Sequence, residues 1–409
     1  MNLSTSAQAT LLLTCYFSKA NKDDVKPLTN GEWGRFALWL KTQSLNPADL
    51  LQAESQLLLQ NWHDPKISHE RILALLQRGH SLALALEKWQ RAGLWVLTRA
   101  DVDYPWRLKQ RLKNDSPPVL FGCGNQRLLN AGGLAVVGSR HASPVDLAFA
   151  ESIGIKAAAE GIAIVSGGAR GVDETAMQAA AKSGGNVIGV MADSLLNAAT
   201  STKWRSGLME ARTVLISPFY PEATFHTGNA MARNKYIYCL AESALVVRAG
   251  EKGGTVSGAE ENLKKNWVPL WVKPTEEIDA ANAQLVARGG TWCGSDLQQL
   301  TISTLITAGK DSPPNAYPAS PQADLFGQLG EETAQYTGNS ADENIEPVDF
   351  YQMFLNALPQ LAEKPVTVAA LMALTGLQES QLNAWLIRAT ESGAVTVLTH
   401  PDRYQWNTP

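Results

Sequence analysis

The pattern of apolar and polar residues changes along this chain of 409 residues. From about residue 6 to residue 100, apolar residues recur at helical spacing, most clearly in 32–40 and 69–92. From Leu134 onwards, short apolar and β-branched runs alternate with longer stretches of helical periodicity, which is typical of βα units around a parallel sheet. The sequence therefore predicts the α/β fold class, with a helical N-terminal region followed by a Rossmann-like domain.

Six strands and five helices are predicted in the Rossmann-like part. The strands are expected at residues 134–138, 162–166, 186–191, 213–217, 243–248 and 268–272. The helices are expected at residues 144–160, 173–183, about 203–211, 229–240 and 255–265. Right-handed crossovers would bring the carboxyl ends of all six strands to one edge of the sheet.

The segments on either side have simpler patterns. Residues 93–125 predict a connector made of a short strand, a Tyr104-Pro105 turn, a helix and a second short strand. Residues 309–347 are rich in proline and polar residues and predict a flexible linker. After it, helical runs at about 367–375 and 378–392 and a β-ribbon of 394–398 and 404–406 predict a small C-terminal winged-helix domain.

These patterns give four predicted parts. Residues 1–126 form the helical region and connector, 127–305 the Rossmann-like domain, 306–347 the linker and 348–409 the winged-helix domain. A hydrophobic content of 45% and a charged content of 18% are typical of a soluble globular protein. The net charge of −4 means that any nucleic-acid surface must be a local basic patch.

Composition also bears on the compartment. The four cysteines are far apart and include no CxxC pair, which argues against a zinc site or a disulfide framework and suits a reducing cytoplasm. The first residues lack a basic segment, and the apolar run at 9–17 is too short to span a bilayer. We therefore expect a cytoplasmic protein that does not enter the membrane.

Three glycine-rich loops follow predicted strands, and such loops aim backbone N–H groups at anions. The first loop contains Gly138, Ser139 and Arg140; the second contains Gly167, Gly168, Arg170 and Gly171; and the third contains Gly253, Gly254 and Thr255. None of them fits G-x-G-x-x-G, and the chain has no G-x-x-x-x-G-K-[ST] segment, which disfavours dinucleotide binding and P-loop ATP hydrolysis. We expect no cofactor and no metal.

Basic residues gather in the sequence near these loops, where they would follow a phosphodiester backbone. They are Arg140, Arg170, Lys203, Arg205, Arg233, Lys235 and Lys252. The alternative is an ordinary solvated surface. Asp173 is expected to cap the second loop, and the lone histidines His141 and His226 are more often structural than catalytic. No catalytic residue is predicted.

Several segments, in the same order, resemble the motifs of the DNA-processing protein A family (DprA/Smf). They are Val137–Arg140, Ser166–Asp173, Phe225 through Arg233-Asn234 and Gly253–Ala259, preceded by 96–105 and 117–121. The resemblance implies a non-catalytic protein that binds and protects single-stranded DNA and hands it to a RecA-type recombinase, notably in natural transformation. It also implies a homodimer, and the last part is similar to the family's winged helix.

The resemblance assigns roles to individual residues. Arg140 matches the arginine of the family's VGSR turn, and Lys203 lies where the family carries a basic DNA contact. Arg233-Asn234 matches an Arg-Asn pair near the DNA path, and residues 167–171 match a glycine-rich loop. Recombination and defence against mobile DNA are the alternative pathways.

Three further interpretations stay open. Gly253-Gly254-Thr255 followed by Glu260-Glu261 partly resembles the loop of the Lonely Guy phosphoribohydrolases, so the alternative function is a nucleotide sensor or an N-glycoside hydrolase. The C-terminal domain is acidic, which favours a protein contact over DNA reading. In the linker, Gln322, Leu325 and Phe326 resemble a peptide that docks into the bacterial sliding clamp.

Overall fold

A computed structural model of the protein describes residues 3–19, 21, 24–52, 55–277, 279–294 and 296–307, and then 354–355, 358–359, 365–375, 379–392, 394–398 and 403–407. They belong to two compact units, Met1–Leu329 and Gly330–Pro409. Residues 308–353, which include the clamp-like Gln322, Leu325 and Phe326 and nearly all of the expected linker, lie outside the described residues.

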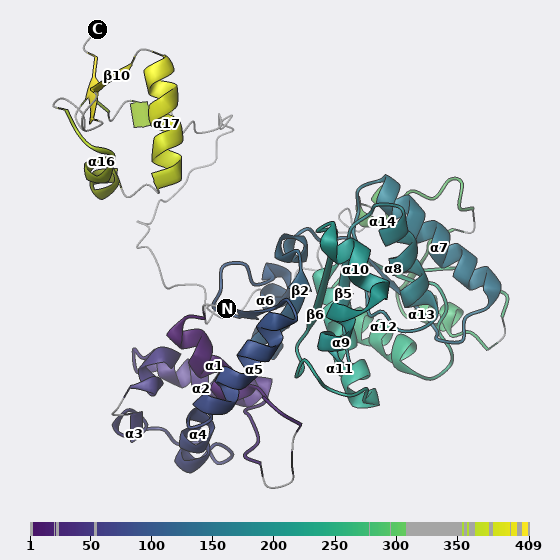
Figure 1. Cartoon of the computed structure of the whole chain (residues 1–409). Helices are drawn as coiled ribbons and strands as arrows, with labels where there is room; N and C mark the ends of the chain where they lie inside the picture. The colour runs from purple at the N-terminus through teal and green to yellow at the C-terminus, as the bar shows by residue number, and fades with distance from the viewer. Residues whose placement is uncertain are drawn as a thin grey trace, which may run out of the picture. The chain divides into compact units, whose positions relative to one another are not determined.

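The first unit is built on one mixed sheet (Figure 1). Its strands, in spatial order, are β1 (Leu94–Thr98), β2 (Val119–Gly124), β6 (Thr213–Ser217), β5 (Val187–Val190), β4 (Ile164–Ser166), β3 (Leu134–Val137), β7 (Ser243–Val246), β8 (Leu270–Val272) and β9 (Thr291–Trp292). From β6 to β9 all neighbours are parallel, whereas β1–β2 and β2–β6 are antiparallel.

Helices cover both faces of this sheet. One face packs against α1 (Thr5–Thr14), α5 (Gly79–Arg91), α7 (Pro144–Ala159), α8 (Val172–Lys182), α9 (Leu195–Thr200), α10 (Thr202–Met209) and α14 (Ile302–Thr307). The other face packs against α6 (Trp106–Leu112), α11 (Thr227–Leu240), α12 (Gly254–Lys265) and α13 (Asn282–Ala287). Alternation along β3 serves both cores, because Leu134 and Val136 contact the first layer and Ala135 and Val137 the second.

The six strands predicted from residue 134 onwards are confirmed, with ends that differ by one or two residues. The predicted helix at 203–211 is α10, and the short α9 precedes it. The periodic stretch at 69–92 is two helices, α4 (His69–Leu76) and α5. The break falls at Arg78-Gly79, where the Arg78 guanidinium donates to the carbonyls of Leu12 in α1 and of Cys15 just after it, and Gly79 is a poor helix former.

The two connector strands belong to the same sheet as the βα units. All five residues of β1 pair with β2, and β2 pairs with β6 from Phe121 opposite Ser217 to Gly124 opposite Val214. The sequence predicted the strands but not this pairing, because antiparallel partners nearly a hundred residues apart leave no local signal. As a result, the helical region is joined to the Rossmann-like part by backbone hydrogen bonds.

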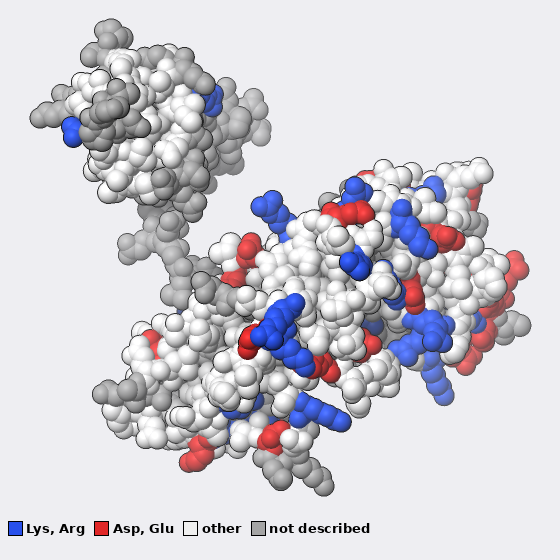
Figure 2. Space-filling model, viewed as in Figure 1, with Lys and Arg blue, Asp and Glu red and all other residues white. Residues whose placement is uncertain are grey.

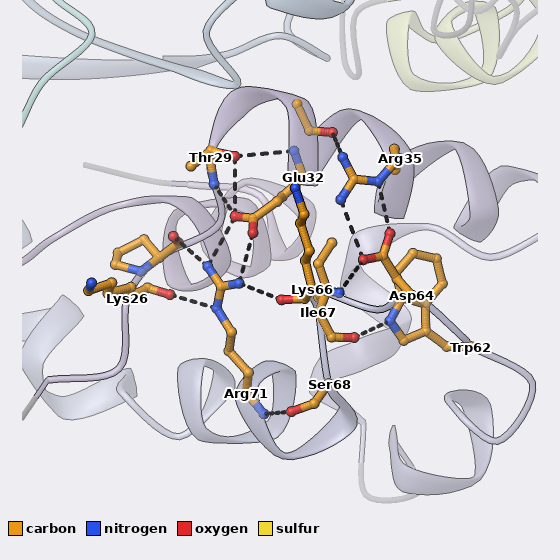
Figure 3. A network of polar contacts seen from close by, with 12 residues as sticks. Lys26, Thr29, Glu32, Arg35, Trp62, Asp64, Lys66, Ile67, Ser68 and Arg71 are labelled. Carbon is orange, nitrogen blue, oxygen red and sulfur yellow. Dashed lines mark hydrogen bonds and ion pairs between the residues drawn. The ribbon is translucent and has the colours of Figure 1, made fainter.

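The helical region has a core of its own around α2 (Asn30–Thr42) and α4, beside the short helices η1 (Pro47–Leu51) and α3 (Ser55–Leu58). Figure 3 shows the polar network at its edge, where Arg71 is central. Its guanidinium donates to the carbonyls of Lys26, Pro27 and Lys66, each at 3.0 Å, and to both carboxylate oxygens of Glu32. Glu32 is also half of the capping box of α2 with Thr29.

We expect Arg71→Met to lower the free energy of unfolding at pH 7 by about 2 kcal/mol, because it leaves several acceptors without their charged donor. The hydrogen bond from Arg71 lowers the pKa of Glu32 below its ordinary value of 4.5. A lowered folded-state pKa stabilises the protein above the unfolded value, and this contribution disappears as the pH falls through the folded value. Urea unfolding of both proteins should therefore show a smaller difference at acidic pH.

The matched control is Arg91→Met, which removes an ion pair with Glu87 whose side chains are 77% and 58% exposed. Its effect should stay below about 0.5 kcal/mol. An equal loss of stability in the two variants, or a loss for Arg71→Met that does not depend on pH, would contradict this account of the network.

The second unit contains α16 (Val368–Thr375), α17 (Glu379–Glu391) and the antiparallel pair β10 (Val395–Leu398) and β11 (Arg403–Trp406). This is the expected order of two helices and a β-ribbon, and its core includes Leu371, Leu382, Leu386 and Val395. The winged-helix assignment itself stays a prediction. In the described ranges of the chain, no helix is long and apolar enough to cross a membrane.

Candidate functional site

The three glycine-rich loops meet where the direction of the sheet connections changes. β3 and β7 are parallel neighbours, yet the helix after β3 (α7) covers one face and the helix after β7 (α12) covers the other. Their connections therefore separate at the carboxyl ends of the strands, which leaves a crevice of the kind that binds ligands in open α/β sheets. The predicted gathering of the loops at one edge is observed.

A cavity of about 370 Å³ lies in this crevice, and we call it the loop cavity. Its lining includes Gly138, Ser139 and Arg140 of the first loop, and Gly250 and Lys252–Thr255 of the third. Helix α11 completes the lining with Thr227, Ala230, Met231, Arg233, Asn234 and Tyr238. Eight of the predicted site residues thus line one space: Gly138, Ser139, Arg140, Arg233, Asn234, Gly253, Gly254 and Thr255.

Asp173 fastens the first two loops together. Gly138 N–H donates to its Oδ1 at 3.2 Å, and Gly167 N–H donates to its Oδ2 at 3.3 Å. The side chain is buried, and this burial raises its pKa, against the opposite effect of the Arg233 charge and the two N–H groups. The expected role of Asp173 in organising the second loop therefore extends to the first loop.

Further bonds fix the first loop to its neighbours. The Thr255 hydroxyl donates to the Gly138 carbonyl at 3.1 Å, which ties in the third loop. Ser139 N–H donates to the carbonyl of Arg248, and the Arg248 guanidinium donates to the carbonyl of His141 at 2.8 Å. Asn234, which the resemblance placed near the DNA path, donates through Nδ2 to the Gly254 carbonyl at 3.0 Å.

Glycine is required in the second loop for two different reasons. A Cβ atom on Gly167 would lie 1.1 Å from Nη1 of Arg233, so this position leaves room for the guanidinium. Gly171 has a φ of +91°, and a Cβ there would lie 2.5 Å from the carbonyl oxygen of Ser139 in the first loop. The glycines of this loop thus let it pack closely on its neighbours.

Arg233 was predicted to grip a phosphate beside the loops, and the structure buries its side chain. Only 4% of the residue is exposed, because it shares the inner face of α11 with Ala230 and Ile237. In the part of the chain that the structure describes, its Nε and Nη1 atoms are buried without a hydrogen-bond partner. Burial lowers its pKa, the charge of Asp173 opposes this change, and the nearby Arg140 adds to it.

Arg140 is exposed and lies over the ring of Phe225, with its Cζ 5.0 Å from the ring centroid. Phe225, itself 51% exposed, also lines a second, larger space of about 680 Å³ that we call the Phe225 hollow. Gly168, Lys203 and Trp204 line the same hollow. The two spaces therefore adjoin at the stacked pair of Arg140 and Phe225.

Lys203, the other predicted DNA contact, belongs to the Phe225 hollow. Its ammonium group lies 2.8 Å from a carboxylate oxygen of Glu174 and 4.9 Å from the centre of the Trp204 ring. Arg170, Arg205 and Lys252 are exposed. Lys235 lies beside Tyr236, with 5.3 Å from its ammonium group to the ring centroid, and is not among the lining residues of either space.

The two histidines differ in their positions. His226 caps α11, and its Nδ1 accepts the N–H of Gly228 at 3.1 Å, which is a structural role. His141 lines the loop cavity and follows the arginine of the first loop. Neither the spacing nor the composition of the sequence distinguished these two environments.

A buried ionic group supports the first loop from behind, and sequence reasoning did not find it. Asp146 is only 1% exposed and forms the capping box of α7 with Ser143. The ammonium group of Lys273 donates to Oδ1 of Asp146 at 2.8 Å. The guanidinium of Arg248 donates to both carboxylate oxygens of a second aspartate, Asp279. Burial raises the pKa of Asp146, but hydrogen bonds from Lys273 and Ser143 outweigh burial and lower it overall.

Other lining residues were also missed, although a signal for some of them was present. The missed residues Thr227, Ala230 and Met231 stand at positions i, i+3 and i+4, and the predicted Asn234 follows at i+7, so the four form one face of α11. That face is complete only when the helix begins at residue 227, two residues before the predicted start at residue 229. Asp193 of the Phe225 hollow follows a strand end and had no distinguishing pattern.

The rival hydrolase interpretation needs an acidic group at the third loop. Glu260 forms an ion pair with Arg288, and neither Glu260 nor Glu261 lines the loop cavity. Asp173 does line it, but both of its oxygens accept loop N–H groups. The arrangement therefore does not favour N-glycoside hydrolysis.

The positive charge of the site is local. On the face shown in Figure 2, lysine and arginine side chains are interspersed with aspartate and glutamate. This agrees with the net charge of −4 and with the expectation that any nucleic-acid surface must be a confined patch.

The fold and the crevice define a protein of the Rossmann-like class with a candidate ligand site at the switch point of its sheet. A family model described as DNA recombination-mediator protein A matches residues 95–302, which is half of the chain. The chain belongs to this family, and the resemblance to DprA/Smf proteins is confirmed.

Individual relatives support the same family. The chain is 27% identical over 186 residues to DNA processing protein DprA of Bacillus subtilis, covering 45% of this chain and 62% of that protein, which is less than two thirds of its length. It is 23% identical over 392 residues to Protein Smf of Synechocystis, covering 90% and 98%. The structure of DprA from Streptococcus pneumoniae matches with a TM-score of 0.53 at 20% identity, over 73% of this chain and 97% of that one, and supports the fold.

Proposed function

We propose that this protein binds single-stranded DNA without chemical conversion, through the loop cavity and the adjoining Phe225 hollow. The observation that supports this proposal is the convergence of three glycine-rich loops with Arg140 and the buried Arg233 at one edge of the sheet. Backbone N–H groups and arginines are the groups that hold phosphates, and exposed aromatic rings stack on unpaired bases. Membership in a family of DNA recombination mediators supports the same choice.

The path of the strand follows from the order of these groups. Phosphates would contact the first loop and Arg140, and the next ones would reach Lys203 across Phe225. Only small displacements of Lys203 from Glu174 are needed to free its ammonium group, since both side chains are about one third exposed. In this proposal Arg233 packs against Gly167 of the second loop, and its buried side chain forms part of the wall of the loop cavity.

The wider role is part of the same proposal. A protein of this kind would protect single-stranded DNA and pass it to a RecA-type recombinase in the cytoplasm, as a homodimer, during DNA uptake, recombination or defence against mobile DNA. The acidic C-terminal unit would serve as a winged-helix module for protein contact, and the linker peptide with Leu325 and Phe326 as a contact for the sliding clamp.

The test is a double variant, Arg140→Ala with Lys203→Ala. We expect the affinity for an oligothymidylate to fall at least about tenfold at low salt, and the slope of log K against log salt to decrease by about 1.4, or 0.7 for each lost phosphate contact. Fluorescence anisotropy at several salt concentrations measures both quantities. The matched control, Arg127→Ala with Lys182→Ala, removes exposed charges at the opposite edge of the sheet and should bind as the wild type does. Equal binding by the two double variants would overturn the proposal.

A further inference from the structure

The loop cavity has an excess of positive charge that the protein itself does not neutralise. Among the described residues, Arg140, Arg233 and Lys252 line it, and Asp173 is the one carboxylate in the lining. Both oxygens of Asp173 already accept N–H groups from Gly138 and Gly167. An anion is therefore the ligand that this cavity suits.

Arg233 is the strongest indication of a ligand. It is more than nine-tenths buried and lines the cavity, and within the described residues its Nε and Nη1 atoms have no hydrogen-bond partner, although the charges of Asp173 and Asp193 act on it through space. A buried guanidinium with two unpaired nitrogen donors is costly, and a strongly charged oxyanion compensates that cost best. The structure thus keeps a charged donor with unpaired N–H groups in the wall of the loop cavity.

Size and charge decide which phosphate fits. An internal phosphodiester carries one negative charge and must enter and leave with the chain continuing in both directions. A terminal phosphate monoester carries nearly two charges at pH 7 and needs only one opening. The loop cavity is the smaller of the two adjoining spaces, about 370 Å³ against about 680 Å³, and the two meet at the stacked pair of Arg140 and Phe225.

We propose that the loop cavity binds the phosphate monoester at the end of a DNA strand, and that the following nucleotides pass over Phe225 into the Phe225 hollow. This inference rests on the proposed function, because it specifies the ligand of the same site. It makes the protein a reader of strand ends, whereas the proposed function requires only binding along a strand.

The experiment compares internally labelled oligothymidylates of one length that carry a 5′-phosphate, a 3′-phosphate or hydroxyl groups at both ends. We expect the oligonucleotide with a phosphate at one of the ends to bind at least about tenfold more tightly than the dihydroxyl form. The first two arms identify which end enters. Thymidine monophosphate with the phosphate at that end should compete, and thymidine should not. Equal affinity for all three oligonucleotides would overturn the inference and leave the proposed function intact, whereas no binding to any of them would overturn the proposed function.

Variants locate the effect. Arg233→Gln should remove the preference for the phosphorylated end, and Lys252→Ala, at an exposed position that does not threaten folding, should reduce it severalfold. Arg127→Ala with Lys182→Ala should keep the full preference. If Arg233→Gln does not fold, the Lys252→Ala result decides: an unchanged preference in that variant would place the recognition of the end outside the loop cavity and overturn the assignment.

Discussion

Replacing Asp173 with alanine is expected to lower the free energy of unfolding by about 3–5 kcal/mol, the range for breaking a buried ionic arrangement. Three groups lose their acceptor or counter-charge at once: the N–H groups of Gly138 and Gly167 and the guanidinium of Arg233. The first and second loops would separate, so affinity for single-stranded DNA should fall with stability. Urea unfolding and anisotropy measure the two effects.

Asp193→Ala is the matched control for this variant. Asp193 is also an aspartate near the carboxyl edge of the sheet, but it is exposed and lines the Phe225 hollow. Its replacement should change the free energy of unfolding by less than about 0.5 kcal/mol. A small effect of Asp173→Ala, comparable to this control, would mean that the loops keep their arrangement without the carboxylate.

The second large effect is expected from Gly167→Ala. The added methyl group would overlap Nη1 of Arg233 at 1.1 Å and Cζ at 2.0 Å, so either the guanidinium or the loop must move. We expect a loss of about 3 kcal/mol, at the upper end for overpacking a buried site, together with weakened DNA binding. Gly254→Ala is the control, because its Cβ would meet only Nδ2 of Asn234, at 3.4 Å.

A double-mutant cycle separates the clash from other effects. In Gly167→Ala with Arg233→Ala the guanidinium is absent, so the methyl group has room and the two losses should not add. The combined variant should be more stable than the sum of the single changes predicts. Strict additivity would show that the cost of the alanine has a different origin, such as the backbone of the second loop.

The sequence was sufficient for the Rossmann-like part because its signals are local. Each buried parallel strand, such as Leu134–Val137, is a short apolar run bounded by turn residues, and Ser143-Pro144 marks a helix start. The gathering of the loops then followed from the handedness of the crossovers. The pairing of β2 with β6 was not predictable in this way, because it depends on which distant strand offers a free edge.

The loops of the site were predictable from the sequence, but the burial of its side chains was not. Glycine-rich turns with Arg140 identify the ligand edge, whereas the burial of Arg233 depends on how α11 is rotated against the sheet. Charge alone suggests an exposed side chain, and only the helix face shared with Ala230 and Ile237 shows otherwise. Likewise, Asp146 and Lys273 are 127 positions apart, so no sequence pattern connects them.

The antiparallel strand β2 has a consequence for synthesis of the chain. Residues 94–124 emerge from the ribosome early and can pair locally as β1 and β2, but the other partner of β2, strand β6, ends only at Ser217. Until about a hundred further residues have been made, one edge of β2 carries unpaired backbone groups of the kind that attract other strands. The short length of this strand, Val119–Gly124, and the left-handed glycine at its end (φ of +87°) limit that exposed edge during the interval.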